Sequence, residues 1–219
     1  MIPLNELKKF QKPVEEDDYF TSRIYRKFSI FLSWVFVNIK VNANIVTLLG
    51  LILDIITLYF IYNGLWIIAG ILVQLFIIWD CVDGEVARYN RNKQKNKEIK
   101  NYGAFLDEML GLMIFYFIIL LIGVYTNIYA GIIAAYSMIL LNLSAVLATH
   151  LFPKKEISKE IQTKIIKNKK IKGKLGFSAD IQRTLISLAL FFHSSIFLWI
   201  YSAGALSLVL IKFYIYRNK

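Results

Sequence analysis

The sequence predicts an all-α membrane protein with six transmembrane helices and, before them, an N-terminal interfacial amphipathic helix. Of its 219 residues, 57% are hydrophobic and only 19% are charged, whereas soluble domains are about 45–50% apolar and about 25% charged. The single cysteine, Cys81, excludes an intrachain disulfide. Without paired Cys and His clusters, a structural zinc site has no support either. The bilayer is therefore the expected solvent for most of the chain.

Six stretches are long and apolar enough to cross a hydrocarbon core about 30 Å thick. The predicted spans are Asn44–Tyr62, Trp66–Arg88, Gly103–Tyr125, Tyr129–Leu151, Ile181–Leu198 and Trp199–Ile215. These spans divide the chain into a cytoplasmic N-terminal segment (1–43), a six-helix transmembrane domain (44–215) and a cytoplasmic tail (216–219).

The basic residues predict the orientation of the spans. All 26 Lys and Arg side chains fall in four regions: residues up to Lys40, the 88–100 loop, the 154–183 loop and the tail from Lys212. Cytoplasmic loops of membrane proteins carry an excess of Lys and Arg. Both termini and both basic loops are therefore expected on the cytoplasmic side of the cell membrane, which requires an even number of spans.

The N-terminal segment contains a short amphipathic pattern. Its apolar residues recur at helical spacing at Ile24, Phe28, Phe31 and Val35, and basic residues lie elsewhere around the turn. One interpretation is a helix lying in the membrane interface. The other is a short helix packed against the bundle, and the pattern favours neither.

Charged residues inside or at the ends of spans are costly, so they are the first candidates for function. Asp80 and Asp83 lie at the cytoplasmic end of the second predicted span. Their spacing places both carboxylates on one helix face with the small residues Gly84 and Ala87. Asp107 lies at the cytoplasmic start of the third predicted span. Because consecutive spans are antiparallel neighbours, we expect the three aspartates to converge.

Three clustered carboxylates repel one another unless a cation lies between them. Oxygen ligands favour a hard divalent ion, best Mg²⁺ and also Mn²⁺, which proteins commonly hold together with substrate phosphates. The implied chemistry is a metal-assisted displacement at phosphorus, with the ion neutralising a diphosphate. The alternative is structural: the aspartates pair with Arg88 and neighbouring lysines at the membrane boundary.

The same residues form a recognisable motif. The pattern is Asp80-x-x-Asp83-Gly84-x-x-Ala87-Arg88, followed by Gly103-x-x-x-Asp107. It resembles the signature of the CDP-alcohol phosphotransferase (CDP-alcohol phosphatidyltransferase) superfamily, whose members are six-span membrane enzymes. Upstream, Asn44-Ile45-Val46-Thr47 is similar to the family's Pro-Asn-x-x-Thr entry to the first span.

The resemblance implies an activity and its partners. A substituted phosphate would pass from a CDP-alcohol, such as the CDP-linked lipid CDP-diacylglycerol, to an acceptor alcohol, releasing CMP in phospholipid or related lipid biosynthesis. Membrane lipids and a second copy of the chain, in a homodimer, would be its other partners, and nucleic acid would not be one.

The resemblance also implies roles for individual residues. Asp80, Asp83 and Asp107 would hold the divalent metal, with Asp83 and Asp107 acting in catalysis. The cytidine nucleotide site would comprise Asn44, Thr47, Asp80, Asp83, Gly84, Ala87 and Arg88. Near the fifth span, Arg183 and lysines would contact a phosphate or an anionic acceptor.

Two departures from the family pattern stand out. The spacer at residues 89–102 is longer than usual, and the family's fourth aspartate falls on Gly111. Three readings stay open for this position: an enzyme that works with one metal or with a base or ordered water supplied elsewhere, retained binding with lost catalysis, or a deliberate change of this residue. A membrane prenyltransferase is a further alternative, although such enzymes have more spans and two separate Asp motifs.

Overall fold

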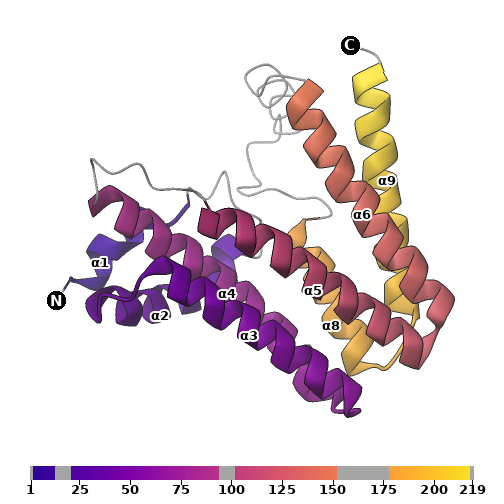
Figure 1. Ribbon diagram of the computed structural model, residues 1–219, viewed down its shortest axis with the longest axis horizontal. Coiled ribbons are helices and arrows are strands. Elements are labelled where there is room, and N and C mark those ends of the chain that lie inside the picture. Colours follow the sequence, from indigo (N-terminus) through magenta and orange to yellow (C-terminus); the bar gives the residue numbers. More distant parts are fainter. Residues whose placement is uncertain (1, 13–20, 94–101, 152–177, 218–219) are drawn as a thin grey trace.

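The structure is a computed structural model that describes residues 2–12, 21–93, 102–151 and 178–217. For residues 93, 102–108, 148–151 and 215–217 it describes the backbone alone. Regular structure in the described residues is entirely helical (Figure 1), which confirms the predicted all-α class. Most of the 154–183 loop and most of the 88–100 loop lie outside the described residues.

The helices fall into an N-terminal group of short elements and a group of longer ones. The N-terminal group is α1 (Leu4–Leu7), the 3₁₀ turn η1 (Lys8–Phe10), the π-helical turn η2 (Thr21–Tyr25) and α2 (Arg26–Asn38). The second group is α3 (Ala43–Tyr62), α4 (Trp66–Lys93), α5 (Tyr102–Thr126), α6 (Ile128–Leu151), α8 (Ala179–Phe191) and α9 (Ile196–Arg217).

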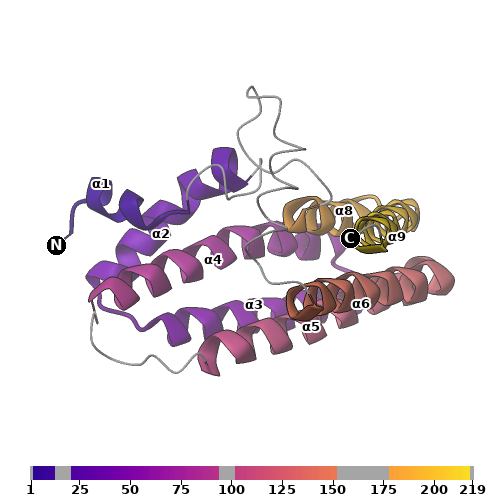
Figure 2. The same cartoon turned by 90° about the horizontal axis from the view of Figure 1, so that it is seen from above.

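The contacts of the six helices from α3 onward close into a ring, in which α6 and α9 are inclined to the other four helices (Figures 1 and 2). Around it, α3 packs on α4, α4 on α8, α8 on α9, α9 on α6, α6 on α5, and α5 again on α3. In the described part of the chain, α4 and α5 do not pack extensively on each other. Their shared neighbour α3 therefore holds the two motif-bearing helices on one side of the molecule.

The structure contains five helices that are long and apolar enough to cross a membrane, among the described residues. These are α3, α4, α5, α6 and α9. The remaining ring helix, α8, has 13 residues, which is about 20 Å at 1.5 Å per residue and shorter than a hydrocarbon core of about 30 Å. Its described length does not support the predicted sixth span.

The predicted boundary between the last two spans is wrong. The hydropathy pattern predicts a fifth span that runs to Leu198, but α8 ends at Phe191 and α9 begins at Ile196. His193 takes a left-handed conformation with φ 45°, which ends an α-helix. The Ser195 carbonyl then accepts hydrogen bonds from Leu198 and Trp199 and starts the next helix. Local backbone geometry overrides an apolar run that continues on both sides of the turn.

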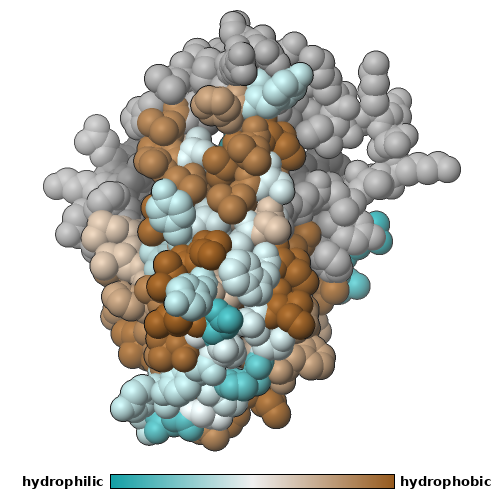
Figure 3. All heavy atoms as spheres, turned by 90° about the vertical axis from the view of Figure 1, so that its right-hand side faces the viewer, coloured by the Kyte–Doolittle hydropathy of each residue, from teal (hydrophilic) through white to brown (hydrophobic). Residues whose placement is uncertain are grey.

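Apolar side chains cover the outside of the ring as well as filling it. Ile118, Ile122 and Leu190 are at most 1% exposed in the core. On the outer surface, large apolar or aromatic side chains are exposed at Ile132, Tyr136, Leu143, Leu206 and Leu210. Figure 3 shows such residues over most of the face formed by α6 and α9. An apolar surface of this extent indicates an integral membrane protein.

A close helix crossing in the ring depends on two glycines. A Cβ added at Gly123 of α5 would lie 2.5 Å from the Cα of Gly131 in α6, which is too close for any side chain. Small residues of this kind let membrane helices approach closely. Gly123→Val should therefore destabilise the protein by about 1–3 kcal/mol, measured as a lower Tm in detergent. Val124→Leu, at a neighbouring position that is 61% exposed, should leave the Tm unchanged. Equal losses in both variants would contradict the assigned contact.

Candidate functional site

Two of the predicted motif residues, Thr47 and Asp83, meet where α4 approaches the start of α3. Thr47 lies one turn into α3, and its Oγ1 donates a hydrogen bond to Asp83 Oδ2 at 2.7 Å. Asn44, in the first turn, is exposed, and its backbone N–H donates to the capping oxygen of Asn42 at 3.2 Å. The entry motif of α3 and the aspartate motif of α4 are thus one structural unit, although they are far apart in the sequence.

Asp80 faces an arginine from α8. Arg183 Nη1 lies 3.7 Å from Asp80 Oδ2, and the Asp80 side chain is 60% exposed. The Arg183 guanidinium also lies over the ring of Phe76, 4.6 Å from its centroid. A guanidinium held in this way suits recognition of phosphate or carboxylate groups. The structure therefore places Arg183 beside the predicted metal ligands.

Gly84 makes room for Arg88 within α4. A Cβ added at Gly84 would lie 3.1 Å from Arg88 Nη1 and 3.4 Å from Nη2. Arg88 Nε donates a hydrogen bond to the carbonyl oxygen of Phe10 at 2.5 Å. Ala87, the other small residue of the motif, is half-buried. The space beside Gly84, which the resemblance predicts for the nucleotide, is thus next to a guanidinium.

The α5 half of the motif is described only in part. The side chain of Asp107 and the surroundings of Gly103 lie outside the described residues. At Gly111 an added Cβ would meet no atom of the described residues within 4 Å. Among the described side chains, no group of three or more His, Cys, Asp or Glu residues lies close enough to hold a metal ion.

The described donors still match a divalent cation in their chemistry. Asp80 and Asp83 are oxygen donors on one helix face, one turn apart, and the Thr47 hydroxyl holds the second. Hard cations such as Mg²⁺ prefer such oxygen ligands. Asp80 and Asp83 are therefore the described residues that would hold the metal, and the part of Asp107 stays a prediction.

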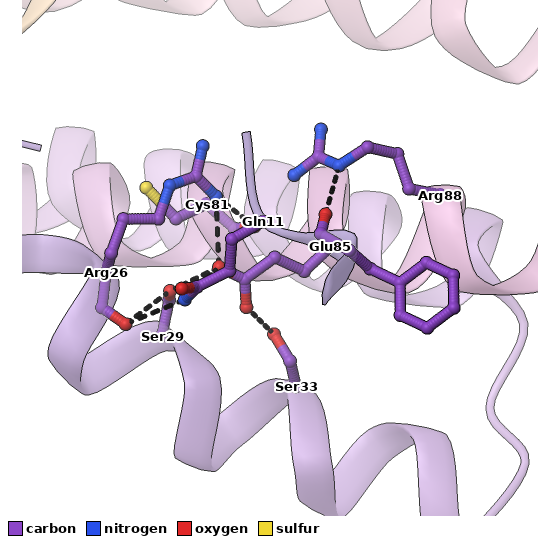
Figure 4. Close-up of polar contacts among 8 residues, drawn as sticks. Gln11, Arg26, Ser29, Ser33, Cys81, Glu85 and Arg88 are labelled. Atoms are coloured by element: carbon purple, nitrogen blue, oxygen red, sulfur yellow. Dashed lines mark hydrogen bonds and ion pairs between the residues drawn. The ribbon is translucent and has the colours of Figure 1, made fainter. Parts of the chain in front are cut away.

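Sequence reasoning missed a buried carboxylate inside the motif. Glu85 is 0% exposed and follows Asp83 by two positions, which places it on the opposite side of α4. Its donors come from the N-terminal segment: Arg26, Ser29, Ser33 and Gln11 (Figure 4). A signal was present in the sequence, because Arg26, Ser29 and Ser33 share one face of the N-terminal helix, away from its apolar stripe.

A second buried carboxylate, Asp180, was also missed. It lies in the first turn of α8 and is 5% exposed. Its Oδ2 accepts from the backbone N–H of Thr21 at 2.9 Å and from the Thr21 hydroxyl. Nearby, the Tyr25 hydroxyl donates to Gln74 Oε1 at 2.8 Å. The N-terminal segment is thus hydrogen-bonded to Asp180 in α8 and to Gln74 in α4, in addition to its bonds with Glu85 inside the motif.

Comparison with known proteins agrees with these features. The family model for CDP-alcohol phosphatidyltransferase matches residues 40–211, which include every motif residue named above. No curated protein matches the chain significantly. Members of the matched family are transferases that use a CDP-alcohol donor and an alcohol acceptor, in general with a divalent metal. The chain belongs to the CDP-alcohol phosphatidyltransferase family.

Proposed function

We propose that this protein transfers a substituted phosphate from a CDP-linked lipid, such as CDP-diacylglycerol, to an acceptor alcohol in phospholipid or related lipid biosynthesis. CMP is the second product. The observation that supports this most directly is the 2.7 Å contact between Thr47 and Asp83. It joins the entry motif of α3 to the aspartate motif of α4, whose oxygen donors can bind a cation that also binds a diphosphate.

The proposed reaction is a displacement at phosphorus. The acceptor oxygen forms a bond to the phosphorus that carries the alcohol of the donor. The bond from that phosphorus to the bridging oxygen breaks, and its electron pair leaves with CMP. The acceptor's hydroxyl proton passes to a base. Bound Mg²⁺ or Mn²⁺ would supply charge neutralisation of the diphosphate.

The chain's own residues bind and orient the reactants. Thr47 fixes the rotamer of Asp83, so that its other oxygen faces a constant direction. Asp80 pairs with Arg183 across 3.7 Å, a distance that leaves the pair weak and exchangeable with a cation. Arg183 is then available to the phosphate of the donor or to an anionic acceptor.

The same proposal places the protein in the cytoplasmic membrane with its site on the cytoplasmic side. The N-terminal helix supports a position in the interface, because its apolar residues point outward: Phe28 is 59%, Phe31 61% and Val35 45% exposed. A helix packed on a soluble protein would bury that stripe. The buried face of α2 instead carries three polar residues, Arg26, Ser29 and Ser33, together with Ile30 and Val37. Sidedness and the homodimer stay predictions.

Binding of CDP to the detergent-purified protein, with and without Mg²⁺, tests the proposal. A ligand at 100 times its Kd stabilises the native state by about 2.7 kcal/mol, so the Tm should rise only when both are present. Release of CMP from a CDP-lipid in the presence of candidate acceptors should follow. Release of pyrophosphate from a prenyl donor would favour a prenyltransferase, and metal-dependent binding without turnover would favour a silent binding protein. A folded protein without any shift would contradict the proposed site.

Thr47→Val should weaken metal-dependent CDP binding by about 10–100-fold, the usual effect of removing a partner that orients a metal ligand. The methyl group that replaces the hydroxyl cannot donate to Asp83. Thr57→Val is the matched control, because the Thr57 hydroxyl donates to the Leu53 carbonyl in the same helix, at 2.9 Å. Isothermal titration with CDP should show full affinity for the control. Equal CDP affinities in both variants would show that Thr47 does not contribute to the site.

A further inference from the structure

We propose that the N-terminal segment completes the nucleotide site, and that Glu85 is a positioning residue which holds this segment against Arg88. Through Glu85, Gln11 and α2 are fixed on α4, and the neighbouring Phe10 carbonyl is placed against the Arg88 guanidinium. The inference rests on the proposed function, because it takes Arg88 as a nucleotide contact.

Glu85 is fully satisfied by donors from one segment of the chain. Its Oε1 accepts from Arg26 Nη1 at 3.0 Å, Gln11 Nε2 at 3.0 Å and Ser29 Oγ at 2.9 Å. Its Oε2 accepts from Ser33 Oγ at 2.6 Å. A buried charge persists only when it is paired and hydrogen-bonded. The burial of Glu85 therefore requires these donors in their places.

The attachment of α2 to α4 is specified by this polar contact. Arg26, Ser29 and Ser33 form the buried face of α2, while its apolar stripe is exposed. Ile30 and Val37 add apolar contacts within the same cluster. Apolar packing alone allows several registers of one helix on another, whereas a buried ion pair with matched hydrogen bonds selects one.

Gln11 connects this cluster to Arg88. Its Nε2 donates to Glu85 and, at 3.1 Å, to the carbonyl of Arg26. The preceding residue, Phe10, accepts from Arg88 Nε through its carbonyl at 2.5 Å. Figure 4 shows Gln11 reaching Glu85 while Arg88 donates to the adjacent residue of the same segment. Two positions one turn apart on α4 are thus held by two consecutive residues of the N-terminal segment.

The hydrogen bond to Phe10 orients the Arg88 guanidinium. The five donors of a guanidinium lie in one rigid plane, so a bond at Nε fixes the direction of the others. Nη1 and Nη2 accordingly lie above Gly84, next in sequence to Asp83. Nη2 is buried at this position, and the planar fork of a guanidinium matches a diphosphate in its chemistry. The presentation of Arg88 depends on residue 10, and hence on Glu85.

A double-mutant cycle tests the inference in the full-length protein. CDP affinity in Mg²⁺ is measured for the parent protein, Glu85→Gln, Arg88→Ala and the double variant, with the Tm of each. Glu85→Gln should lower affinity about tenfold when Arg88 is present, as expected for an orienting partner. It should have no further effect on the Arg88→Ala background, because residues that act through one another are not additive. The Tm should fall by the same amount in both backgrounds.

A merely structural role for Glu85 would give equal affinity losses with and without Arg88, and that result would overturn the inference. Gln11→Ala provides a second variant that leaves the Arg26–Glu85 pair intact, and it should show the same dependence on Arg88. Asn142→Ala is the control, since it removes a 3.1 Å contact with the Tyr116 hydroxyl between α6 and α5; CDP affinity should not change.

The cycle also separates this inference from the proposed function. Failure of the parent protein to bind CDP would overturn both. CDP binding that is unaffected by Arg88→Ala would overturn the positioning inference alone, since the nucleotide would then bind without the residue that Glu85 is proposed to place.

Discussion

Asp83→Asn should abolish Mg²⁺-dependent CDP binding and lower CMP release by about three orders of magnitude or more. A metal ion contributes several kcal/mol of charge stabilisation, and each 1.36 kcal/mol is a factor of about ten in rate. An amide oxygen carries no net charge and is a poor replacement for a carboxylate ligand. The loss is measured as CMP released and as the Tm shift on adding CDP and Mg²⁺.

The Tm measured without metal distinguishes a variant that has lost a metal ligand from a variant that no longer folds. The asparagine side chain of the Asp83→Asn variant still offers an oxygen to Thr47, and it removes the repulsion from Asp80, so the metal-free Tm should not fall. Asp80→Asn and Asp107→Asn should behave in the same way. Asp54→Asn, in the buried part of α3, is the control and should keep Mg²⁺-dependent binding. Retained binding in the Asp80, Asp83 and Asp107 variants together would refute the metal assignment.

Gly111→Asp should raise turnover, because it restores the carboxylate at the position where the family carries one. General-base catalysis contributes about 10²–10⁴-fold, which sets the scale of the expected gain. Among the residues that the structure describes, none has an atom within 4 Å of a Cβ added at Gly111. A new carboxylate near the others is costly without a cation, so the Tm should also become more dependent on Mg²⁺.

Gly111→Ala is the matched control for this gain. Alanine stabilises a helix by about 1 kcal/mol relative to glycine, so this variant should raise the Tm without raising turnover. Gly111→Asn adds a side chain of the same shape without the charge and should also leave turnover unchanged. Unaltered activity in a folded Gly111→Asp protein would show that the site works without a fourth carboxylate.

Some residues of the candidate site could be predicted from the motif, and others are revealed only by contacts in the fold. The pairing of Thr47 with Asp83 joins the entry motif of α3 to the aspartate motif of α4, while the roles of these residues in binding stay predictions. The contact between Arg183 and Asp80 could not be predicted from the sequence, because neither the aspartate motif nor the residues around Arg183 indicate that α8 lies beside α4. Glu85 occupies a position that the motif leaves unspecified, so only the donors around it reveal its importance.

The sequence by itself determined the all-α class, the extents of most long helices and the family, because these depend on hydropathy and on spacings within one segment. Only the tertiary structure decided which face of α2 is buried and what Glu85 contacts. The physical reason is that these features depend on partners distant in the chain, as with Arg26 and Glu85, which are 59 residues apart. The polar face of α2 is buried because a charged partner from α4 lies beneath it, and lipid can solvate the apolar face.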